Sequence, residues 1–450
     1  MESKHSKDTT MKIKIWIALI LFCVILFLPA SSQEENQSPV ILDDLIKAAL
    51  ENNPRIDAAI QRIQAAERAV PQAGALPDPK LTLGLMNLPV NSFAFDQEPM
   101  TGKMISVMQM FPFPGKQSLA TDMAEFEVKV RKYQRDEIRN QVVQMVKQGY
   151  YELYGVDRAI ETVKKNRSLM KQLVQVVETK YATGSGLQQD VLRAQVELSK
   201  IEDDLVMWEQ KRLAIEARLN AVLNRPAELR FGVTPRELSI PEIQDHDFSL
   251  DRIEKTRPLL SAWQEKIRKA EVSVSLAQKD LWPNFTLGTS YSQRNNLQNG
   301  AVMHDFFSIS FSLDIPIFAG RKQKAQIAQR QLDLKALDSE YKDVESGVLA
   351  EIAGLRAELE RHSKRIALYE GGILLQARQS LESAQVGYQV GKVDFLTLIS
   401  NWMMLQNYEL QFAFAVAEYH KILARIELAT GRGIAGRSEG WAGLAAYPEK

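Results

Sequence analysis

The sequence has almost no cysteine and little histidine. Metal and thiol-based catalytic sites usually need several such residues at short, regular spacings. The one cysteine, Cys23, lies in an apolar run, and the five histidines are dispersed: His5, His246, His304, His362 and His420. A Walker loop and a G-x-S-x-G elbow are also missing. We therefore expect no enzyme activity, no catalytic residue, no cofactor and no metal site.

One glycine motif invites a different interpretation. Residues 431–436 read GRGIAG and match G-x-G-x-x-G, but they follow a helical pattern instead of a strand and open no helix. A dinucleotide site needs the opposite context. The motif therefore indicates the end of a helix, followed by a flexible tail at 432–450.

The chain also lacks an excess of charge. Lys and Arg number 56, and so do Asp and Glu. Nucleic-acid binding usually leaves a basic footprint, so a nucleic-acid partner is not expected.

Long apolar runs are absent except near the N-terminus. Lys12 and Lys14 precede an apolar segment from Ile15 to Leu28, and Ala30-Ser31-Ser32 follows it. This order is typical of a secretory signal peptide, here residues 1–32, and an uncleaved anchor is the alternative. Phe22 before Cys23 does not fit a lipidation signal. Since no other run is long enough for a membrane helix, any insertion must use strands.

The remaining chain contains a tandem repeat. The segment NPRIDAAIQRIQAAE from Asn53 aligns with RPLLSAWQEKIRKAE from Arg257, and DPKLTLGL from Asp78 aligns with WPNFTLGT from Trp282. The turn YATG at Tyr181 returns as YQVG at Tyr388. Each copy predicts a helix, two strands and a long helical hairpin.

These boundaries give a division of the chain. The first repeat spans 33–224, with a β-hairpin at 80–112 and a helical tip near 181–190. A proline-containing connector spans 225–247. The second repeat spans 248–431, with a β-hairpin at 283–318 and a tip near 388–397.

Apolar residues at spacings of three and four predict long packed helices. One stripe follows the first tip and another follows the second: Leu198, Ile201, Leu205, Trp208, Ile215, Leu219 and Val222, then Leu405, Tyr408, Phe412, Ala415, Tyr419, Ile422, Ile426 and Ala429. The stretches 117–182 and 322–387 before the tips contain no proline. A continuous helix of that length spans about 100 Å, as in coiled-coil assemblies.

Alternation with period two marks the strands. In FFSISFSLDIPIF, apolar residues from Phe307 to Ile315 alternate with serines and Asp314. A half-buried soluble sheet has the same pattern. Two such hairpins in a repeated, exported chain instead favour a membrane barrel. Four strands are too few to close one, so two, three or four chains must share it.

The combination resembles the TolC-like outer-membrane efflux proteins over about residues 42–431. The resemblance rests on the duplicated unit, the flanks ALPDPKL and FPFPGK, and the turns YATG and YQVG; the flanks look most like the heavy-metal, CzcC-like branch. It implies a mainly α fold with a β-barrel portion: a long-helix tunnel and a homotrimer sharing a twelve-stranded barrel in outer-membrane lipid. It also implies a periplasmic adaptor and an inner-membrane pump, of the resistance-nodulation-division type.

The resemblance further implies which residues work at the periplasmic tip. The gate would comprise Asp190, Tyr388, Asp394, Thr397 and Ser400. The adaptor would contact Gly184, Gly186, Leu187, Gly391 and Val393. Family members carry an arginine where this chain has Val393, and acidic residues where it has Thr397 and Ser400.

Several alternatives stay open from the sequence. Asp190 is either a lock that bonds across to Tyr388 or a helix N-cap. Methionines at Met86, Met104, Met108 and Met110 suit soft metals, but they also pack irregular gaps. The cargo is metal cations, organic toxins or, in a type I secretion duct, protein. A periplasmic coiled-coil scaffold without a pore is the rival class.

Overall fold

The structure is a computed structural model that describes residues 39–241 and 250–432. The expected signal peptide, Cys23, His5, His246 and nearly all of the expected tail lie outside the described residues. Every helix and strand of the described chain belongs to one compact unit, whose described residues are 41–230, 234–241 and 250–432. Residues 231–233 belong to a second unit, in which the Val40 amide donates to the Val233 carbonyl at 3.3 Å.

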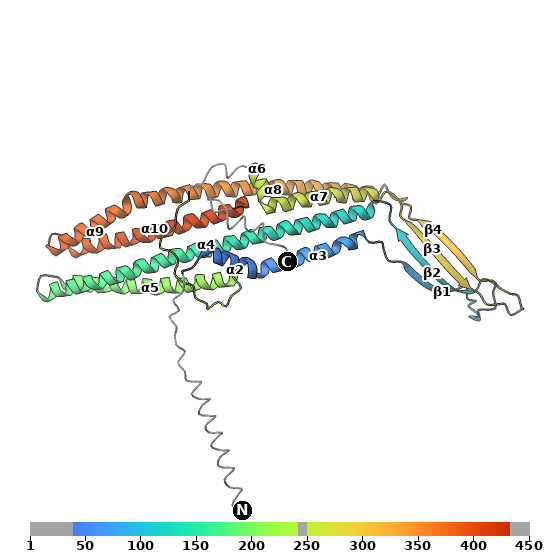
Figure 1. Cartoon of the computed structure of the whole chain (residues 1–450), viewed down its shortest axis with the longest axis horizontal. Coiled ribbons are helices and arrows are strands. Elements are labelled where there is room, and N and C mark those ends of the chain that lie inside the picture. Colours follow the sequence, from blue (N-terminus) through green and yellow to red (C-terminus); the bar gives the residue numbers. More distant parts are fainter. Residues whose placement is uncertain (1–38, 242–249, 433–450) are drawn as a thin grey trace, which may run out of the picture. The chain divides into compact units, whose positions relative to one another are not determined.

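Both repeats have the same order of elements (Figure 1). The first comprises α2 (Leu42–Asn52), α3 (Pro54–Gly74), β1 (Lys80–Met86), β2 (Gly102–Phe111), α4 (Lys116–Ala182) and α5 (Gln188–Val222). The second comprises α6 (Leu250–Thr256), α7 (Pro258–Lys279), β3 (Phe285–Gln293), β4 (Phe306–Leu313), α8 (Gln323–Leu368), the π-helix η2 (Tyr369–Ile373), α9 (Leu374–Gln389) and α10 (Phe395–Thr430). The predicted fold class, mainly α with a small β portion, is confirmed.

Proline starts the equivalent helix of each repeat. Pro54 and Pro258 occupy the first positions of α3 and α7, where a missing amide hydrogen costs nothing. The Asn53 side chain also accepts from the Arg55 amide at 3.0 Å and so caps α3. The aligned prolines therefore mark true helix starts.

The two long helices differ in continuity. Helix α4 runs unbroken for 67 residues. The stretch from Gln323 to Gln389 is also helical without a gap, but α8 gives way to the π-helical turn YEGGI before α9. The adjacent glycines Gly371 and Gly372 supply the cause, since glycine pairs and π-turns are where helices kink.

The helical core is built around α4 and α10. Helix α4 packs against α3, α5, α7 and α10, and α10 also packs against α8 and α9. One buried cluster joins Tyr154 of α4 to the C-terminal part of α10 and to α8. A second joins α4 and α5 to α9 and α10 nearer the turns, with Phe395 and Trp402 at its centre. The predicted heptad stripes supply both clusters.

A buried carboxylate fixes the connector to the helices. Asp157 of α4 accepts from the Thr234 amide and hydroxyl, each at 2.9 Å, and from Arg212 Nε at 2.7 Å. The described part of the connector, 225–241, contains no helix or strand. The contacts of Asp157 therefore hold Thr234 against α4.

The four strands form one antiparallel sheet in the order β1-β2-β3-β4. Leu83 pairs with Ile105, which pairs with Tyr291, which pairs with Phe307. Since side chains on paired strands share a face, this row is apolar and exposed. The next row, Thr82, Ser106, Ser290 and Ser308, lies on the other face and is small and polar.

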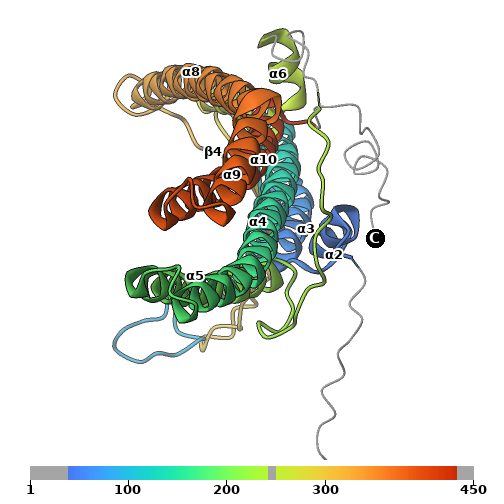
Figure 2. The same ribbon diagram turned by 90° about the vertical axis from the view of Figure 1, so that its left-hand side faces the viewer.

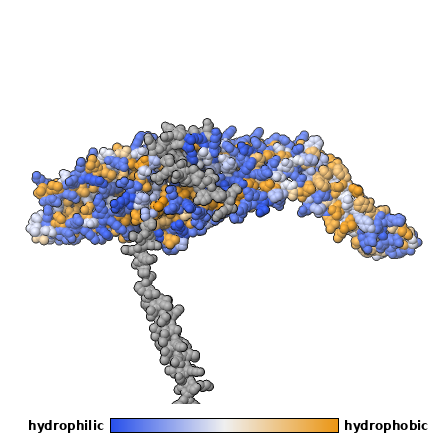
Figure 3. All heavy atoms as spheres, in the orientation of Figure 1, coloured by the Kyte–Doolittle hydropathy of each residue, from blue (hydrophilic) through white to orange (hydrophobic). Residues whose placement is uncertain are grey.

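The apolar face of the sheet is open to the surroundings. Its exposed members include Leu81, Leu83, Leu85, Val107, Leu287, Phe307, Ile309 and Phe311. Figure 3 shows hydrophobic surface gathered over the strands. Met104, Met108 and Met110 lie on the opposite face, at alternate positions of β2. Among the described residues, none of the helices has the length and apolar character to span a membrane.

The alternating pattern of β4 ends earlier than the sequence suggests. Ile315 was expected to continue the strand, but β4 stops at Leu313. The Asp314 amide still donates to the Asn284 carbonyl at 3.0 Å. Pro316 then removes the next possible donor, so the chain leaves the sheet and turns toward α8.

Candidate functional site at the hairpin tips

The two Y-x-x-G turns lie at the ends of neighbouring helical hairpins. Figure 2 shows the α4–α5 turn in green and the α9–α10 turn in red on the side facing the viewer. Lys180 of the first hairpin contacts Tyr388 of the second. The structure thus brings together residues separated by about two hundred positions.

Both turns use the same left-handed glycine. Gly184 has φ +72° and Gly391 has φ +74°, a region that side-chain-bearing residues avoid. In the first turn, the Ser185 amide donates to the Lys180 carbonyl at 2.8 Å. In the second, the Lys392 amide donates to the Gly387 carbonyl at 2.8 Å. These bonds define a Schellman motif, so each glycine terminates its helix.

At two matched positions, one turn has a large residue where the other has glycine. A Cβ on Gly186 would lie 3.0 Å from Lys180 Cβ. At the equivalent site, a Cβ on Gly387 would lie 2.6 Å from Val393 Cγ2. Lys180 aligns with Gly387, and Gly186 aligns with Val393, at the spacing of 207 that aligns the tyrosines. Each turn therefore has room for a side chain at only one of these two positions. The first turn carries it at the earlier position, as Lys180, and the second at the later position, as Val393.

Lys180 uses this position to hold the second turn. Its Nζ donates to the Tyr388 carbonyl at 2.8 Å and lies 4.1 Å from the centre of the Tyr388 ring. An ammonium over an aromatic face is attracted by the ring electrons. We call these two contacts the Lys180 clasp. Sequence analysis missed it, although the alignment of Lys180 with glycine was a visible sign.

The two tyrosines have different environments. Tyr181 is 48% exposed, whereas Tyr388 is 7% exposed and packs on Phe395 with ring centres 5.7 Å apart. Burial raises the pKa of the Tyr388 hydroxyl, and the negative charge of Asp190 raises it further. Tyr388 therefore remains protonated and anchors the second turn in the core.

Asp190 does not cap a helix. The N-cap residue of α5 is Leu187, which makes no side-chain bond, and Asp190 lies within the first turn. The N-cap alternative for Asp190 is therefore wrong, because α5 begins at Gln188, directly after Leu187. Within the described chain, Asp190 and Tyr388 interact through charge without a hydrogen bond between their side chains.

Three charged residues from both hairpins interact at the tip. Burial raises the pKa of Asp190, Arg193 opposes this, and Asp394 of the other hairpin raises it again. Arg193 also lowers the pKa of Asp394. The positive charge of Arg193 on α5 therefore favours the ionised form of both carboxylates. Arg193 aligns with Ser400, so an arginine is present at the tip although Val393 occupies the site where one was expected.

Asp394 is the residue that caps a tip helix. Its Oδ1 accepts from the Thr397 amide at 2.8 Å at the start of α10. Bonds from the side chain and then the amide of Thr397 lower the pKa of Asp394. Thr397 and Ser400 are exposed on the following turn. Helix α10 thus begins with polar side chains on its surface.

Capping makes the start of α10 sensitive to one substitution. We expect Asp394→Ala to raise hydrogen exchange at the Thr397 amide about fivefold at neutral pH, since a lost N-cap frees that donor. Because folding lowers the Asp394 pKa, this stabilisation is present above the unfolded pKa of about 3.9 and disappears as pH falls through the lower folded value.

Asp190→Ala is the matched control for the capping prediction. It removes the other tip aspartate, which caps nothing, so exchange in the first turn of α5 should stay close to that of the unmodified protein. If both substitutions accelerated exchange equally, the negative charge of the two carboxylates, and not capping, would be what protects these amides.

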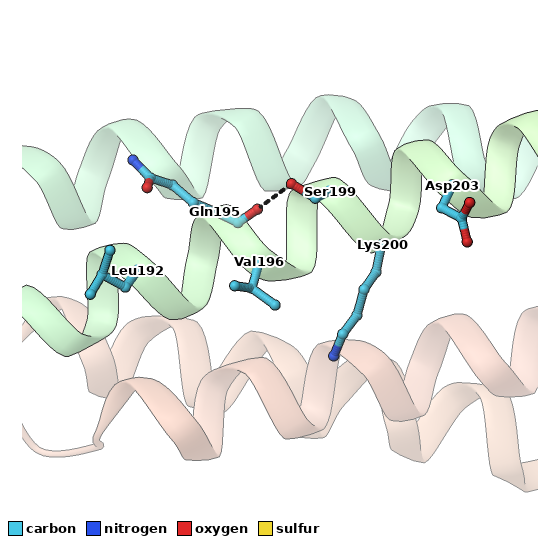
Figure 4. Close-up of a pocket in the computed structure, with 6 residues that line it drawn as sticks. All are labelled: Leu192, Gln195, Val196, Ser199, Lys200 and Asp203. Carbon is cyan, nitrogen blue, oxygen red and sulfur yellow. Dashed lines mark hydrogen bonds between the residues drawn. The ribbon is translucent and has the colours of Figure 1, made fainter.

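A shallow groove lies on α5 next to the tip. Leu192, Gln195, Val196, Ser199, Lys200 and Asp203 line it. Figure 4 shows these side chains along one side of α5, with the Ser199 hydroxyl bonded to the Gln195 carbonyl at 3.1 Å. Leu192 and Val196 are exposed, as are Leu187 and Val390 at the turns. The tip therefore presents apolar side chains beside its charges.

No metal centre forms in the part of the chain that the structure describes. No three or more histidine, cysteine, aspartate or glutamate side chains gather there in a way that could hold an ion.

Comparison with known proteins agrees with this architecture. A model of the outer membrane efflux protein family matches twice, over residues 45–225 and 250–432. The pyoverdine export outer membrane protein OpmQ of Pseudomonas aeruginosa is 22% identical, over 87% of this chain and 83% of its own. The cobalt-zinc-cadmium resistance protein CzcC of Cupriavidus metallidurans is 20% identical, over 88% and 91%.

A solved structure shares the fold. The outer-membrane channel OprN superposes with a TM-score of 0.74 at 18% identity, over 87% of this chain and 90% of that one. The two family matches coincide with the two structural repeats and together span most of the sequence. The chain therefore belongs to the outer membrane efflux protein family and is a protein of the outer membrane.

Proposed function

We propose that three copies of the chain form the passive outer-membrane duct of a tripartite efflux system. The sheet carries this proposal. One face is apolar and exposed, the other is lined with serine, threonine and glycine, and in the described chain β1 and β4 each lack a partner on one side. Lipid does not tolerate open edges, so copies must join. Three copies of four strands give a barrel of twelve.

The helical tips are the proposed site of docking and gating. Gly184, Gly186, Leu187, Gly391 and Val393 would meet a periplasmic adaptor, and the exposed side chains of the groove on α5 extend that surface. Asp190, Tyr388, Asp394, Thr397 and Ser400 would form the gate. A passive duct has no energy source of its own. An inner-membrane pump, which we propose is of the resistance-nodulation-division type, would drive transport.

Heavy-metal cations are the proposed cargo. The flanks of the first hairpin and the likeness to CzcC support this, whereas the likeness to OpmQ supports a larger organic cargo. The polar face of the sheet offers hydroxyls and thioethers, and the described residues contain no cluster of His, Cys, Asp or Glu that could hold an ion. Such a wall would pass cations without retaining them.

A scaffold without a pore fits the sheet less well. It would leave a continuous apolar face of four strands in water, where exposed patches of this kind promote association. A type I secretion duct would share the barrel and differ only in its partners and cargo.

The proposal is tested on the full-length protein from outer-membrane fractions. We expect a detergent-stable trimer by light scattering and discrete conductance steps in a planar bilayer. A soluble monomeric rod without conductance would exclude the duct. For the cargo, a strain lacking the gene should lose growth on zinc, cobalt or cadmium and regain it with the intact gene. Unchanged metal tolerance would exclude metal cations.

A further inference from the structure

The segment between β4 and α8 exposes apolar side chains. Ile315, Ile317 and Phe318 are 67%, 76% and 71% exposed. Figure 3 shows hydrophobic surface where the helices lead into the strands. Large apolar side chains grouped in this way mark a contact with something other than water.

Three cations follow the apolar group directly. Arg321, Lys322 and Lys324 are exposed, and none of them forms an ion pair within the described ranges. The Arg321 and Lys322 amides both donate to the Phe318 carbonyl at 3.0 Å, so the chain turns back and keeps the cations near the apolar group. Asp314 is the one acidic residue in 314–326, which leaves this stretch with a net charge of +2.

The start of α8 adds to this positive field. Its N-cap residue, Lys322, makes no side-chain capping bond, and its first turn holds no acidic residue. The N-terminal end of a helix carries a partial positive charge and attracts phosphate groups. The helix end and the three cations therefore favour the same kind of ligand.

The equivalent segment of the first repeat finds its partners within the chain. The Phe113 ring stacks on Trp282 with centres 5.2 Å apart. Lys116, which aligns with Arg321, lies 3.0 Å from Asp280 Oδ1. The first repeat thus shows how such a segment is satisfied internally. The segment after β4 has neither contact in the described part of the chain.

We infer that the segment from Ile315 to Lys324, which we call the basal turn, binds an anionic phospholipid of the periplasmic leaflet. The inference rests on the proposed duct, since the strands must cross the bilayer for the turn to lie at its periplasmic surface. Strand β4 ends at Leu313 and α8 begins at Gln323, so the basal turn joins the sheet to the helices. There the apolar side chains enter the acyl region and the cations meet the headgroup phosphate.

Charge complementarity selects the headgroup. Each Lys or Arg near an anionic membrane surface strengthens binding about fivefold. A zwitterionic headgroup carries its own cation beside the phosphate and so gains much less. The basal turn should therefore prefer phosphatidylglycerol, whose phosphate has no such partner, to phosphatidylcholine.

Binding of fluorescent phosphatidylglycerol to the full-length protein in neutral detergent tests the cationic half. We expect the triple variant Arg321→Gln, Lys322→Gln, Lys324→Gln to bind at least about tenfold more weakly than the unmodified protein. Equal binding of phosphatidylglycerol and phosphatidylcholine by the unmodified protein would overturn the inference.

A second triple variant is the matched control. Arg330→Gln, Lys335→Gln, Lys342→Gln removes the same charge farther along α8, where the sequence has no comparable apolar group. It should bind phosphatidylglycerol as the unmodified protein does. Equal loss of binding in both triple variants would show that net charge alone attracts the lipid, and would overturn the basal turn as its site.

The apolar half distinguishes a lipid from a free anion. Ile317→Ser combined with Phe318→Ser should weaken phosphatidylglycerol binding, because the acyl chains supply part of the contact. Inorganic phosphate at constant ionic strength should fail to displace the lipid. If the serine variant bound lipid normally, or if inorganic phosphate competed fully, the turn would be an anion site and the inference would fail.

A probe at position 317 identifies the occupant in a bilayer. Cys23, the one native cysteine, lies in the expected signal peptide, so Ile317→Cys can be labelled selectively. We expect phospholipid with brominated acyl chains to quench a fluorophore at this cysteine. If a benzophenone maleimide there cross-linked to a second copy instead, the turn would be a contact between copies and the inference would be wrong.

Conductance separates this inference from the proposed duct. A protein that forms a conducting trimer but shows no preference for phosphatidylglycerol would overturn the lipid site and leave the duct intact. Failure of the unmodified protein to form a trimer or to conduct in any of these lipids would overturn the duct, and with it the placement of the basal turn at the membrane surface.

Discussion

Replacing Ile309 with lysine should abolish assembly in the outer membrane, whereas replacing Ser308 with lysine should not. The two residues are neighbours on β4 and point to opposite faces of the sheet. Ile309 is 69% exposed on the apolar face. A lysine near the middle of the bilayer costs about 2–4 kcal/mol per chain, and a trimer would bear that cost three times. A lysine at Ser308 would instead face the water of the proposed duct.

The measurement is the amount of the proposed trimer in outer-membrane fractions, followed by refolding from urea into lipid vesicles. Ile309→Leu is the control for shape and should assemble normally. Ser308→Lys should assemble and shift the channel toward anions. If both lysine variants assembled equally well, the assignment of the two faces would be wrong. If both failed, β4 would be packed on both sides.

The sequence predicted the strands because their periodicity is local. Alternation of apolar and small residues fixes which face each residue takes, and the sheet pairs the strands so that both faces are continuous. The end of β4 was missed because Pro316 acts through a lost donor, which alternation does not reveal. The helical character of 323–389 was predicted, but the π-helical turn within it was not, because the absence of proline does not distinguish an α-helix from one that contains a π-turn.

The position of the tip could be predicted from the sequence, but its side-chain contacts could not. The repeated glycines located both turns, since a left-handed backbone strongly prefers glycine. The roles of Lys180 and Arg193 depend on how two hairpins lie beside each other, and that arrangement is set by packing across the whole helical core. Asp190 and Asp394 were both named from the sequence. Only the structure shows that Asp394 caps its helix while Asp190 acts through its charge.

Breaking the Lys180 clasp should open the proposed gate. Lys180→Met keeps a long apolar stem but removes both the bond to the Tyr388 carbonyl and the charge over the ring. A hydrogen bond from a charged group contributes about 1.5–3 kcal/mol, so the closed arrangement would lose roughly tenfold or more of its population per chain. We expect single-channel recordings to show a larger open fraction and greater mean conductance.

Lys392→Met is the matched control for the clasp. Lys392 lies in the equivalent turn, carries the same charge, and makes no side-chain contact with Tyr388 in the described structure. It should leave conductance near that of the unmodified protein.

The double variant Asp190→Ala with Tyr388→Phe tests the rival view of the gate. It removes the paired groups that the resemblance implies but leaves the Lys180 bond to the backbone intact. If the lock depends on Asp190 and Tyr388, the double variant should conduct more; if the clasp holds the turns, Lys180→Met should have the larger effect. An unchanged conductance in Lys180→Met would remove the clasp from the gate, because a contact that restrains the closed tip cannot be lost without effect.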